Sequence, residues 1–517
     1  MHLKDHDLKQ LNREYLASLT PEQLLDLAER LLNDLRDARD RQNQTPQNSS
    51  RPSGSYAPWE QAQISTAQEQ TKAAGHDEAA ENEKAPKGSA FTEKKPVEAV
   101  ENPDAPEKKK GGKQRGAKGF GRKAELPITG KEIHKATQCM GCGAELRQDA
   151  PFTQQTGSHT LDIKKGEMGL EVSYILHIYG ITGCECGHWT ESKPGRCAPE
   201  EGSDVAITEW HLIGPMLASL IICLSLRMRQ SRPRIQEFLA DWLGISISKG
   251  CISQCLAEGG RAAAPLEEEF VAEIQQAELL HVDETGWKEN GQTVWLWVLK
   301  TATVTFYVIG SRSWDTIAEI MEHFAGWLMS DGYGQYRKYG QRLRCLAHII
   351  RKAKGVGDSC HPEAAEFGKK VLEIINLLIG GIYDARGDPT IDLPERYGEK
   401  LAELKALCTQ YRDHEHEKTQ KLARELLNDW EAIWNVLTYP HLPITNNLAE
   451  QALRHWVISR KISYGTRTKQ GSRAYAILAS VIDTCRQRAV SPWDYIAQVI
   501  AERRKNNPVP ALPELVL

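Results

Sequence analysis

The sequence contains no apolar run long enough to cross a membrane. Its longest uncharged apolar run, Leu212 to Leu226, spans 15 residues and includes Pro215. A transmembrane helix needs roughly 20 apolar residues, so we expect a buried helix over His211 to Arg229 and no membrane partner. Met1 to Gln10 is polar, which lacks the pattern of a secretory signal and predicts a cytoplasmic protein.

Two further signals are missing from the composition. Twelve cysteines in 517 residues do not make a disulfide framework, so paired cysteines indicate metal ligands first. The formal net charge of −4 does not indicate a nucleic-acid-binding protein either. The distribution of charge does indicate nucleic-acid binding, because Gln451 to Ile482 holds six Lys or Arg residues and no acidic residue. The length predicts about three or four domains.

Large apolar residues are almost absent from Arg41 to Glu125, which is rich in Gln, Ser, Ala, Pro, Glu and Lys. Such a segment cannot bury enough surface to offset its chain entropy, so we expect a disordered linker. Its basic end, Lys108 to Lys123, has eight basic residues and no acidic residue. Binding to a phosphate backbone without sequence preference and a purely solvated linker are both open interpretations.

The N-terminal segment predicts a helix with a heptad seam. Thr20, Pro21 and Gln23 form a capping-box start. The apolar seam then repeats at spacings of four and three, the pattern of a coiled coil, through Leu24, Ala28, Leu31, Leu35 and Ala38. About two heptads are strong, so self-association and packing of the helix on its own domain both remain open.

Two cysteine pairs predict a small zinc-ribbon module. Cys139 and Cys142 have the usual Cys-x-x-Cys spacing, whereas Cys184 and Cys186 are separated by one residue. The segment between the pairs, Glu171 to Tyr179, has strand composition. Zinc takes four tetrahedral N or S ligands. We expect these four cysteines to bind it, with His188 and Cys197 as substitutes for the fourth ligand, or else to be reduced structural cysteines.

A helix-turn-helix is predicted directly afterwards. Arg234 to Trp242 is followed by a turn at Gly244 and by a helix over Ser248 to Leu256 that begins at a Ser cap. Lys249 and Gln254 on the second helix are residue types that reach phosphates or base edges in a major groove. That helix is poor in Arg, so a plain helical hairpin is the alternative.

Ala277 to Ser313 is the stretch around which the remainder is organised. It predicts three strands, Leu279 to Glu284, Thr293 to Lys300 and Thr303 to Ile309, with a hairpin turn at Asn290-Gly291. Asp283 is expected at or near the end of the first and central strand. Successive strand residues face opposite sides, so Asp283 and Glu284 cannot share one site.

Two more carboxylates complete a candidate metal site. A short apolar strand ends at Asp331, and Asn446-Asn447 can cap a helix that carries Glu450 in its first turn. Three such carboxylates suit a pair of Mg²⁺ ions that clamp the attacking and leaving oxygens of a displacement on phosphate. Glu450 also has a structural interpretation, as part of a capping box or as a salt bridge with Arg454.

At these residues the sequence resembles the insertion sequence 66 family of bacterial transposases. The resemblance is carried by HVDETGW around Asp283, SDGYGQY around Asp331, CLAHIIRK from Cys345 and NNLAEQALR around Glu450, and it also reaches the N-terminal half. It implies an RNase H-like core with an Asp-Asp-Glu triad, a leucine-zipper segment and a helix-turn-helix like that predicted here. The family's second cysteine pair is Cys-x-x-Cys, from which this chain departs.

The resemblance also bears on the segment between Asp331 and Glu450. Their separation of 119 residues, with three helical patterns at Glu363 to Ala385, Glu395 to His414 and Lys418 to Leu437, predicts an α-helical insertion. Trp430 and Trp434 share a helical face there, as core residues or as a platform for an unpaired base. The family carries a similar Cys-x-x-His at Cys345. We expect His348 to contact the scissile phosphate, to support a metal ligand, or to form a structural hydrogen bond.

The predicted fold class is multidomain α/β with an RNase H-like mixed-sheet core. The expected boundaries are a coiled-coil helix at 1–40, a linker at 41–126, a zinc-binding domain at 127–200, a helix-turn-helix region at 201–262, a first core segment at 263–360, the insertion at 361–440, a second core segment at 441–500 and a tail at 501–517.

The expected function is a bacterial, nucleoid-associated DNA transposase. Asp283, Asp331 and Glu450 would bind two Mg²⁺ ions, and the freed 3′-hydroxyl would attack target DNA. The expected partners are transposon-end DNA, target DNA, a second copy in a homodimer and small accessory proteins of the element. Six basic residues would hold phosphates: Arg454, Arg460, Lys461, Arg467, Lys469 and Arg473. The alternatives are an inactive DNA-binding regulator and a metal-dependent nuclease without strand transfer.

Overall fold

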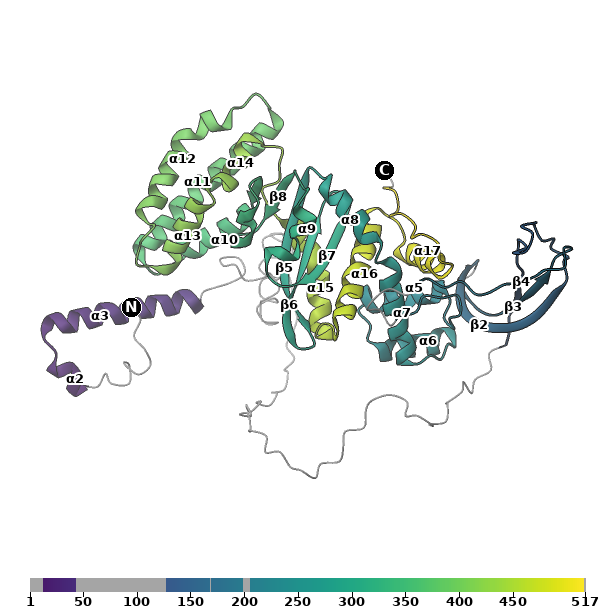
Figure 1. Cartoon of the computed structure of the whole chain (residues 1–517). Helices are drawn as coiled ribbons and strands as arrows, with labels where there is room; N and C mark the ends of the chain where they lie inside the picture. Colours follow the sequence, from purple (N-terminus) through teal and green to yellow (C-terminus); the bar gives the residue numbers. More distant parts are fainter. Residues whose placement is uncertain (1–12, 43–126, 168, 199–204, 516–517) are drawn as a thin grey trace, which may run out of the picture. The chain divides into compact units, whose positions relative to one another are not determined.

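A computed structural model describes residues 13–42, 127–167, 169–198 and 205–515 (Figure 1). Of the predicted disordered linker, Arg41 and Gln42 are helical, and the remainder with its basic end lies outside the described residues. Among the described helices, none is long and apolar enough to span a membrane. The protein is a mixed α/β molecule with two sheets and many helices.

The larger sheet has five strands in the order β7-β6-β5-β8-β9. β5, β6 and β7 are antiparallel neighbours, whereas β8 and β9 run parallel to β5. The three predicted strands and the central place of the first are confirmed. Asn290 and Gly291 form the tight turn of the β5–β6 hairpin with φ values of 49° and 81°. The strands are β5 (Leu279–Glu289), β6 (Gln292–Lys300), β7 (Thr305–Gly310), β8 (Trp327–Ser330) and β9 (Arg342–Arg344).

One expectation about β5 was wrong. Asp283 lies inside the strand, not at its end, because β5 continues to Glu289 as it pairs with β6. The residues that follow Asp283 include Thr285 and Trp287, which suit a strand paired with another aromatic-rich strand. On the other side of β5, however, the pairing with β8 stops at His281. Asp283 therefore lies just past the end of the parallel ladder.

Helices pack against this sheet from distant parts of the chain. α15 (Asn447–Ser463) contacts β5 and β6, and α16 (Lys469–Gln487) contacts β7. α8 (Leu266–Gln275) precedes the sheet, with the short α9 (Ala318–Met321) beside it. α10 (Leu346–Gly357) begins directly after β9. The C-terminal residues thus complete a layer that begins near residue 266.

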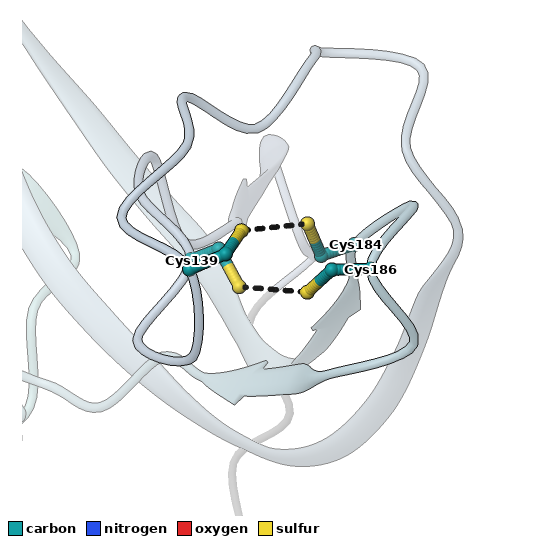
Figure 2. A group of neighbouring side chains, drawn as sticks. Cys139, Cys184 and Cys186 are labelled. Carbon is teal, nitrogen blue, oxygen red and sulfur yellow. Dashed lines mark hydrogen bonds between the residues drawn. The ribbon is translucent and has the colours of Figure 1, made fainter.

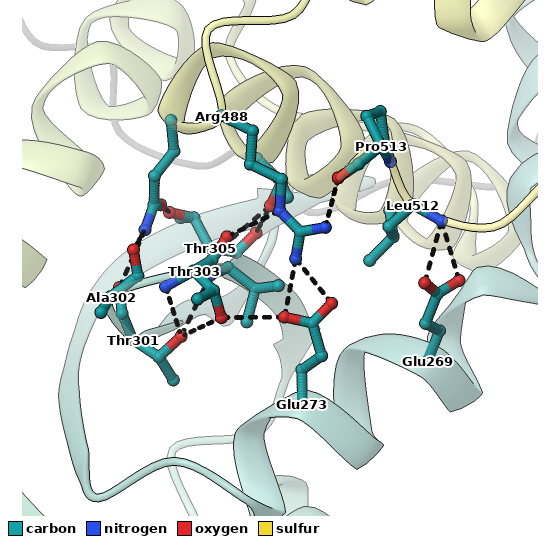
Figure 3. Close-up of polar contacts among 12 residues, drawn as sticks. Glu269, Glu273, Thr301, Ala302, Thr303, Thr305, Arg488, Leu512 and Pro513 are labelled. Carbon is teal, nitrogen blue, oxygen red and sulfur yellow. Dashed lines mark hydrogen bonds and ion pairs between the residues drawn. The ribbon is translucent and has the colours of Figure 1, made fainter. Parts of the chain in front are cut away.

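A polar cluster fastens the C-terminal residues to this layer. Arg488, directly after α16, donates to both carboxylate oxygens of Glu273 on α8 at 2.5 and 2.6 Å. It also donates to the carbonyl oxygens of Thr303 and Pro513 (Figure 3). Nearby, the backbone N–H of Leu512 donates to the carboxylate of Glu269. The last described residues are therefore part of the folded core, behind α17 (Pro492–Arg504).

The helical insertion packs around an apolar core that it shares with α10. The third predicted helix is in fact two helices, which meet at Asp429. This residue is buried and leaves the helical conformation, and its carboxylate binds Arg337 and Arg342, so a continuous helix is interrupted there. The helices are α11 (Pro362–Gly387), α12 (Leu393–Gln410), α13 (Glu417–Asn428) and α14 (Trp430–Thr438).

The smaller sheet and the helix pair lie earlier in the chain. β3 pairs with β1, β2 and β4. The buried apolar helix begins at Pro215, later than His211, because a proline fits the first helical turn, where its missing N–H is not needed. The predicted turn at Gly244 is confirmed with φ 65°, as is the Ser248 cap. The elements are β1 (Gly130–His134), β2 (Phe152–Gly166), β3 (Gly169–Gly183), β4 (Trp189–Glu191), α5 (Pro215–Leu226), α6 (Arg232–Leu243) and α7 (Lys249–Ala263).

The N-terminal helices are α2 (Arg13–Ser18) and α3 (Pro21–Gln42). The predicted capping box is confirmed, since Thr20 and Gln23 exchange side-chain to backbone hydrogen bonds. The apolar seam of α3 is not covered by the described residues of the chain. Leu24, Leu31 and Leu35 are 39%, 37% and 54% exposed.

Candidate functional site

Three carboxylates from separate elements meet at the end of the parallel ladder. Asp283 comes from β5, Asp331 directly follows β8, and Glu450 lies in the first turn of α15. Burial raises the pKa of Asp283 well above its usual value, and the negative charges of Asp331, Glu284 and Glu450 raise it further. Such mutual repulsion marks a site where a bound cation would be stabilised.

Asn446 joins the elements that carry two of these carboxylates. Its side chain is fully buried; the amide donates to the carbonyl oxygen of Val282 at 2.8 Å, and Oδ1 lies 3.0 Å from Nδ1 of His281. Its backbone N–H donates to Sγ of Cys345 at 3.2 Å. The expected capping role of this side chain was wrong, because its polar atoms bind β5 and no cap hydrogen bond remains. Asn446 therefore holds the start of α15 against the strand of Asp283.

The carboxylate of Glu450 faces a histidine and an arginine. Its Oε1 lies 3.6 Å from Nδ1 of His348 and 3.6 Å from Nη2 of Arg351. Oε1 and the histidine Nδ1 are both buried without a hydrogen-bond partner among the described residues. Ligand atoms of Cys345, His348 and Glu450 lie within 4.8 Å of one another. Unpaired buried acceptors of this kind fit a site that receives a metal or its bound water.

The histidine is electrically neutral in this setting. Burial lowers the pKa of His348 to about 3, and the positive charges of Arg351 and Lys352 lower it further. Burial also raises the pKa of Glu450, and the positive charge of Arg351 partly offsets this increase. His348 thus supplies a lone pair beside Glu450 without forming an ion pair that would neutralise the carboxylate.

Glu284 is engaged elsewhere. Its Oε1 accepts hydrogen bonds from Arg312 at 2.9 and 3.1 Å, and its Oε2 accepts one from the hydroxyl of Tyr336 at 2.5 Å. Asp331 is held differently, since its Oδ1 accepts from the backbone N–H of Tyr333 at 2.8 Å and so fixes the turn after β8. Of the two adjacent acids on β5, Asp283 is the one without a charged partner, among the described residues, that would hold it.

The predicted DNA-binding residues separate into two groups. Arg460 donates to Oγ1 of Thr285 and to the carbonyl oxygen of Gly286, so it ties α15 to β5. Arg473 forms an exposed ion pair with Glu267 at 2.9 Å. The others lie exposed on the surface: Lys249, Gln254, Arg454, Lys461, Arg467 and Lys469.

A basic cavity of about 780 Å³ lies between α7 and the loop that joins α15 to α16. The start of α7 contributes Lys249, and the loop contributes Arg467. Further basic residues in its lining are Arg229, Arg232, Arg261 and Arg473. The cavity thus places residues predicted from two distant segments beside each other.

The four predicted zinc ligands come together at one end of the smaller sheet (Figure 2). Sγ of Cys139 lies 3.7 Å from that of Cys186, and Sγ of Cys142 lies 3.7 Å from that of Cys184. A tetrahedron of sulfurs with zinc bonds of about 2.3 Å has edges of about 3.8 Å, so the set fits zinc. Cys197, one suggested substitute, is buried and accepts a hydrogen bond from Arg503.

Two tryptophans of the insertion bear on the idea of a stacking platform. Trp430 and Trp434 form an edge-to-face pair with centroids 5.9 Å apart. Trp434 is buried, and Trp430 packs partly against the same apolar core. Both therefore serve the insertion's core in this structure.

Sequence reasoning missed the positioning residues Asn446 and His281. Both adjoin the carboxylates that they support, within the HVDET and TNNLAE segments. The signal that could have identified them is the presence of a polar residue within a few positions of a predicted metal ligand.

Comparisons with known proteins identify the family of the chain. Residues 211–474 match the family described as "Transposase IS66 family". The chain is also similar to three uncharacterized proteins of Sinorhizobium fredii: y4qI is 23% identical over 53% of this chain and 56% of its own length, y4jO 25% over 33% and 50%, and y4hP 23% over 59% and 62%. The chain thus spans about half to three fifths of these relatives.

The matched residues include Asp283, Asp331 and Glu450 as well as α5, α6 and α7, and they amount to just over half of the chain. The chain belongs to the IS66 family of transposases.

Proposed function

We propose that this protein is a DNA transposase whose Asp283, Asp331 and Glu450 hold two Mg²⁺ ions for cleavage and transfer of DNA strands. The observation that carries the proposal is the meeting of these three acids at the end of the β5–β8 ladder. The strand order and directions of the larger sheet support an RNase H-like core, and family membership supports a DNA-processing enzyme with a divalent metal.

Each chain element has a defined role in this proposal. When bound, the two ions activate the attacking oxygen and neutralise charge on the leaving oxygen. Asn446 keeps Glu450 against the strand of Asp283, and the backbone N–H of Tyr333 orients Asp331. Neutral His348 leaves the charge of Glu450 available for a metal.

DNA recognition would use the basic cavity and the zinc module. The helix pair α6–α7, with its Gly244 turn, supports a helix-turn-helix whose Lys249 and Gln254 face DNA. Lys249 and Arg467 would contact one phosphate backbone from the two walls of the cavity. The Cys139, Cys142, Cys184 and Cys186 sulfurs support a structural zinc ion.

The test incubates the purified full chain and Mg²⁺ with DNA from the ends of its own element, found as inverted repeats beside the gene. Asp283→Asn, Asp331→Asn and Glu450→Gln should keep end binding and lose about 10³-fold in cleavage, because each loss of about 1.4 kcal/mol in metal stabilisation slows the reaction about tenfold. Glu284→Gln is the matched control and should still cleave, since that acid is held by Arg312 and Tyr336.

The outcomes separate this proposal from its two rivals. If the protein were an inactive regulator, the wild type itself would bind the ends and would not cleave them. A nuclease would release cut ends but never join them to a target plasmid. Full cleavage by Glu450→Gln at saturating Mg²⁺ would remove Glu450 from the site.

A further inference from the structure

The C-terminal end of α3 meets the helical insertion through a polar cluster of acids and histidines. Asp37 and Asp40 come from α3, His361 from the start of α11, and His416 from the start of α13. Asp40 is buried; its carboxylate accepts from the hydroxyl of Ser359 and, at 3.0 Å, from the backbone N–H of Cys360. The N-terminal helix is thereby linked to a segment more than 300 residues later.

The distances in this cluster resemble the edges of a coordination tetrahedron. Oδ1 of Asp37 lies 3.2 Å from Nε2 of His361 and 3.9 Å from Nε2 of His416, which itself lies 3.4 Å from Oδ2 of Asp40. Zinc bonds of about 2.0–2.1 Å to N and O give tetrahedral edges of about 3.3–3.4 Å. Ligand atoms of Asp37, His361 and His416 all lie within 4.8 Å of one another.

The orientation of His416 also suits a metal. Its ring lies 3% exposed in the core, with Nδ1 placed 2.7 Å from Oγ1 of Thr419. The contact with Thr419 fixes the orientation of the ring, so that Nε2 points toward the two carboxylates. Many metal-binding histidines are oriented in this way by a partner on the other ring nitrogen.

The charges and lone pairs of these groups suit a divalent cation. Two carboxylates face two imidazole nitrogens, and the rings of His361 and His416 are 4.7 Å apart. One divalent ion would neutralise the carboxylates and use both nitrogen lone pairs.

We propose that Asp37, His361 and His416 bind a zinc-like transition-metal ion, with Asp40 placed beside it to orient the site. This ion is separate from the metals of the carboxylate triad and from the cysteine cluster. It fastens the N-terminal helix to the insertion, so that α3 is held in place when the metal is bound. The site would bind its ion whether or not the proposed reaction takes place.

The test measures the metal content of the purified full chain after exposure to excess zinc and removal of free metal. Wild type should retain two equivalents, Cys142→Ser one, and Asp37→Asn with His361→Gln one. Glu363→Gln is the matched control, because this acid begins the same helix as His361 but pairs with His414. Equal zinc in wild type and the double variant would overturn the proposal.

Cobalt provides a readout that does not depend on counting. In Cys142→Ser, bound Co²⁺ should show the weak visible bands of a nitrogen and oxygen site, without strong thiolate charge transfer. Adding Asp37→Asn alone should abolish those bands, and the side chain of Asp37 is 25% exposed, so the change should not unfold the chain. Persistence of the bands in that variant would contradict the site.

Hydrogen exchange of residues 21–42 tests the fastening role. A chelator should speed exchange in α3 of the wild type and of Cys142→Ser. In the double variant, exchange should already be fast and should not respond. Exchange in α3 that ignores chelator in the wild type would overturn the fastening role.

Discussion

At the scale of single residues, Asn446 is the side chain that holds the start of α15, with Glu450, against the strand of Asp283. It is buried, and both polar atoms of its amide contact β5. A residue that orients a ligand typically changes metal affinity or activity by about 10–100-fold when it is lost. Loss of Asn446 should therefore change metal affinity or activity, although the residue itself need not contact DNA.

We expect Asn446→Ala to cut about 10–100 times more slowly, to need more Mg²⁺, and to keep end binding. A small loss of stability, about 1–3 kcal/mol, should accompany it because His281 and Val282 lose partners. Cleavage rates across a Mg²⁺ titration provide the measurement. Asn447→Ala is the control, since that neighbour is exposed. A normal Mg²⁺ requirement would show that α15 is positioned by other contacts.

Asp283 makes a second residue-scale prediction, about stability and pH. Burial and nearby acids raise the pKa of this carboxyl in the folded protein above its value of 3.8 in the unfolded chain. The folded state therefore favours the protonated form, and stability falls as pH rises from the unfolded pKa to the folded one. At neutral pH the unfolded carboxyl is ionised, so the metal-free folded protein carries a cost at Asp283.

We therefore expect Asp283→Asn to melt at a higher temperature than metal-free wild type at neutral pH, by about 2–4 °C per kcal/mol recovered. The difference should vanish at about pH 3, where the unfolded carboxyl is also protonated. Added Mg²⁺ should raise the melting temperature of wild type more than that of the variant. A variant that melts lower at neutral pH would show that Asp283 is stabilised by its charge.

At the scale of elements, the cysteine cluster holds the end of the smaller sheet together. Its sulfur distances already match a zinc tetrahedron. Chelation should remove the one zinc that this module binds and unfold residues 127–198 locally, because zinc binding in such modules is a folding free energy. Cys142→Ser should lower zinc occupancy, whereas Cys251→Ser, on α7, should not. A metal-free sample whose residues 127–198 still resist proteolysis would remove zinc from the module.

The cluster at the end of α16 makes a prediction about the sheet layer. Arg488 is almost fully buried and is shared by α8, the β6–β7 turn and the C-terminal residues. Arg488→Ala should lower the free energy of unfolding by about 3 kcal/mol, since the half-buried carboxylate of Glu273 and two backbone carbonyl oxygens lose a buried donor. Arg473→Ala removes an exposed ion pair from the same helix and should cost less than about 1 kcal/mol. Denaturant titrations of both variants measure the contrast.

Much of the element pattern could be predicted from the sequence because local signals agree with it. The Asn290-Gly291 turn, the Gly244 turn and the Thr20 cap are set by nearby residues alone. The break at Asp429 could not be predicted, because it depends on Arg337 and Arg342 from another region of the chain. The extent of β5 past Asp283 and the use of Asn446 likewise depend on partners far away in sequence.

The residues proposed as ligands could be named from the sequence, but the residues that position them could not. Carboxylates at strand ends and cysteine pairs have recognisable spacings. The cluster of Asp37, His361 and His416 has none, because its members come from three separate elements. Only the folded chain brings them to one place.

At the scale of the whole molecule, α3 presents an uncovered apolar seam. Its leucines at heptad spacing remain exposed while Asp37 and Asp40 bind the insertion through a different face. Pairing with α3 of a second copy, as in a coiled coil, is the simplest way to bury these leucines. A dimer formed in this way would bring two active sites to two DNA ends.

Leu31→Ser with Leu35→Ser should therefore weaken self-association of the full chain without lowering its melting temperature. Leu25→Ser with Leu32→Ser is the matched control, since these leucines are also exposed but lie off the seam. Sedimentation velocity over a range of concentrations measures both. An unchanged oligomer in the seam variant would assign self-association to another surface.

The separation of the acidic residues along the chain has a consequence for the order of synthesis. Asp283 and Asp331 leave the ribosome before Glu450, with the whole insertion between them. At about 5–20 residues per second, the delay is about 6–24 seconds. During that interval the helix pair α6–α7 has already emerged, but α15 has not. Under the proposed function, a nascent or prematurely ended chain would therefore bind DNA before it is able to cut it.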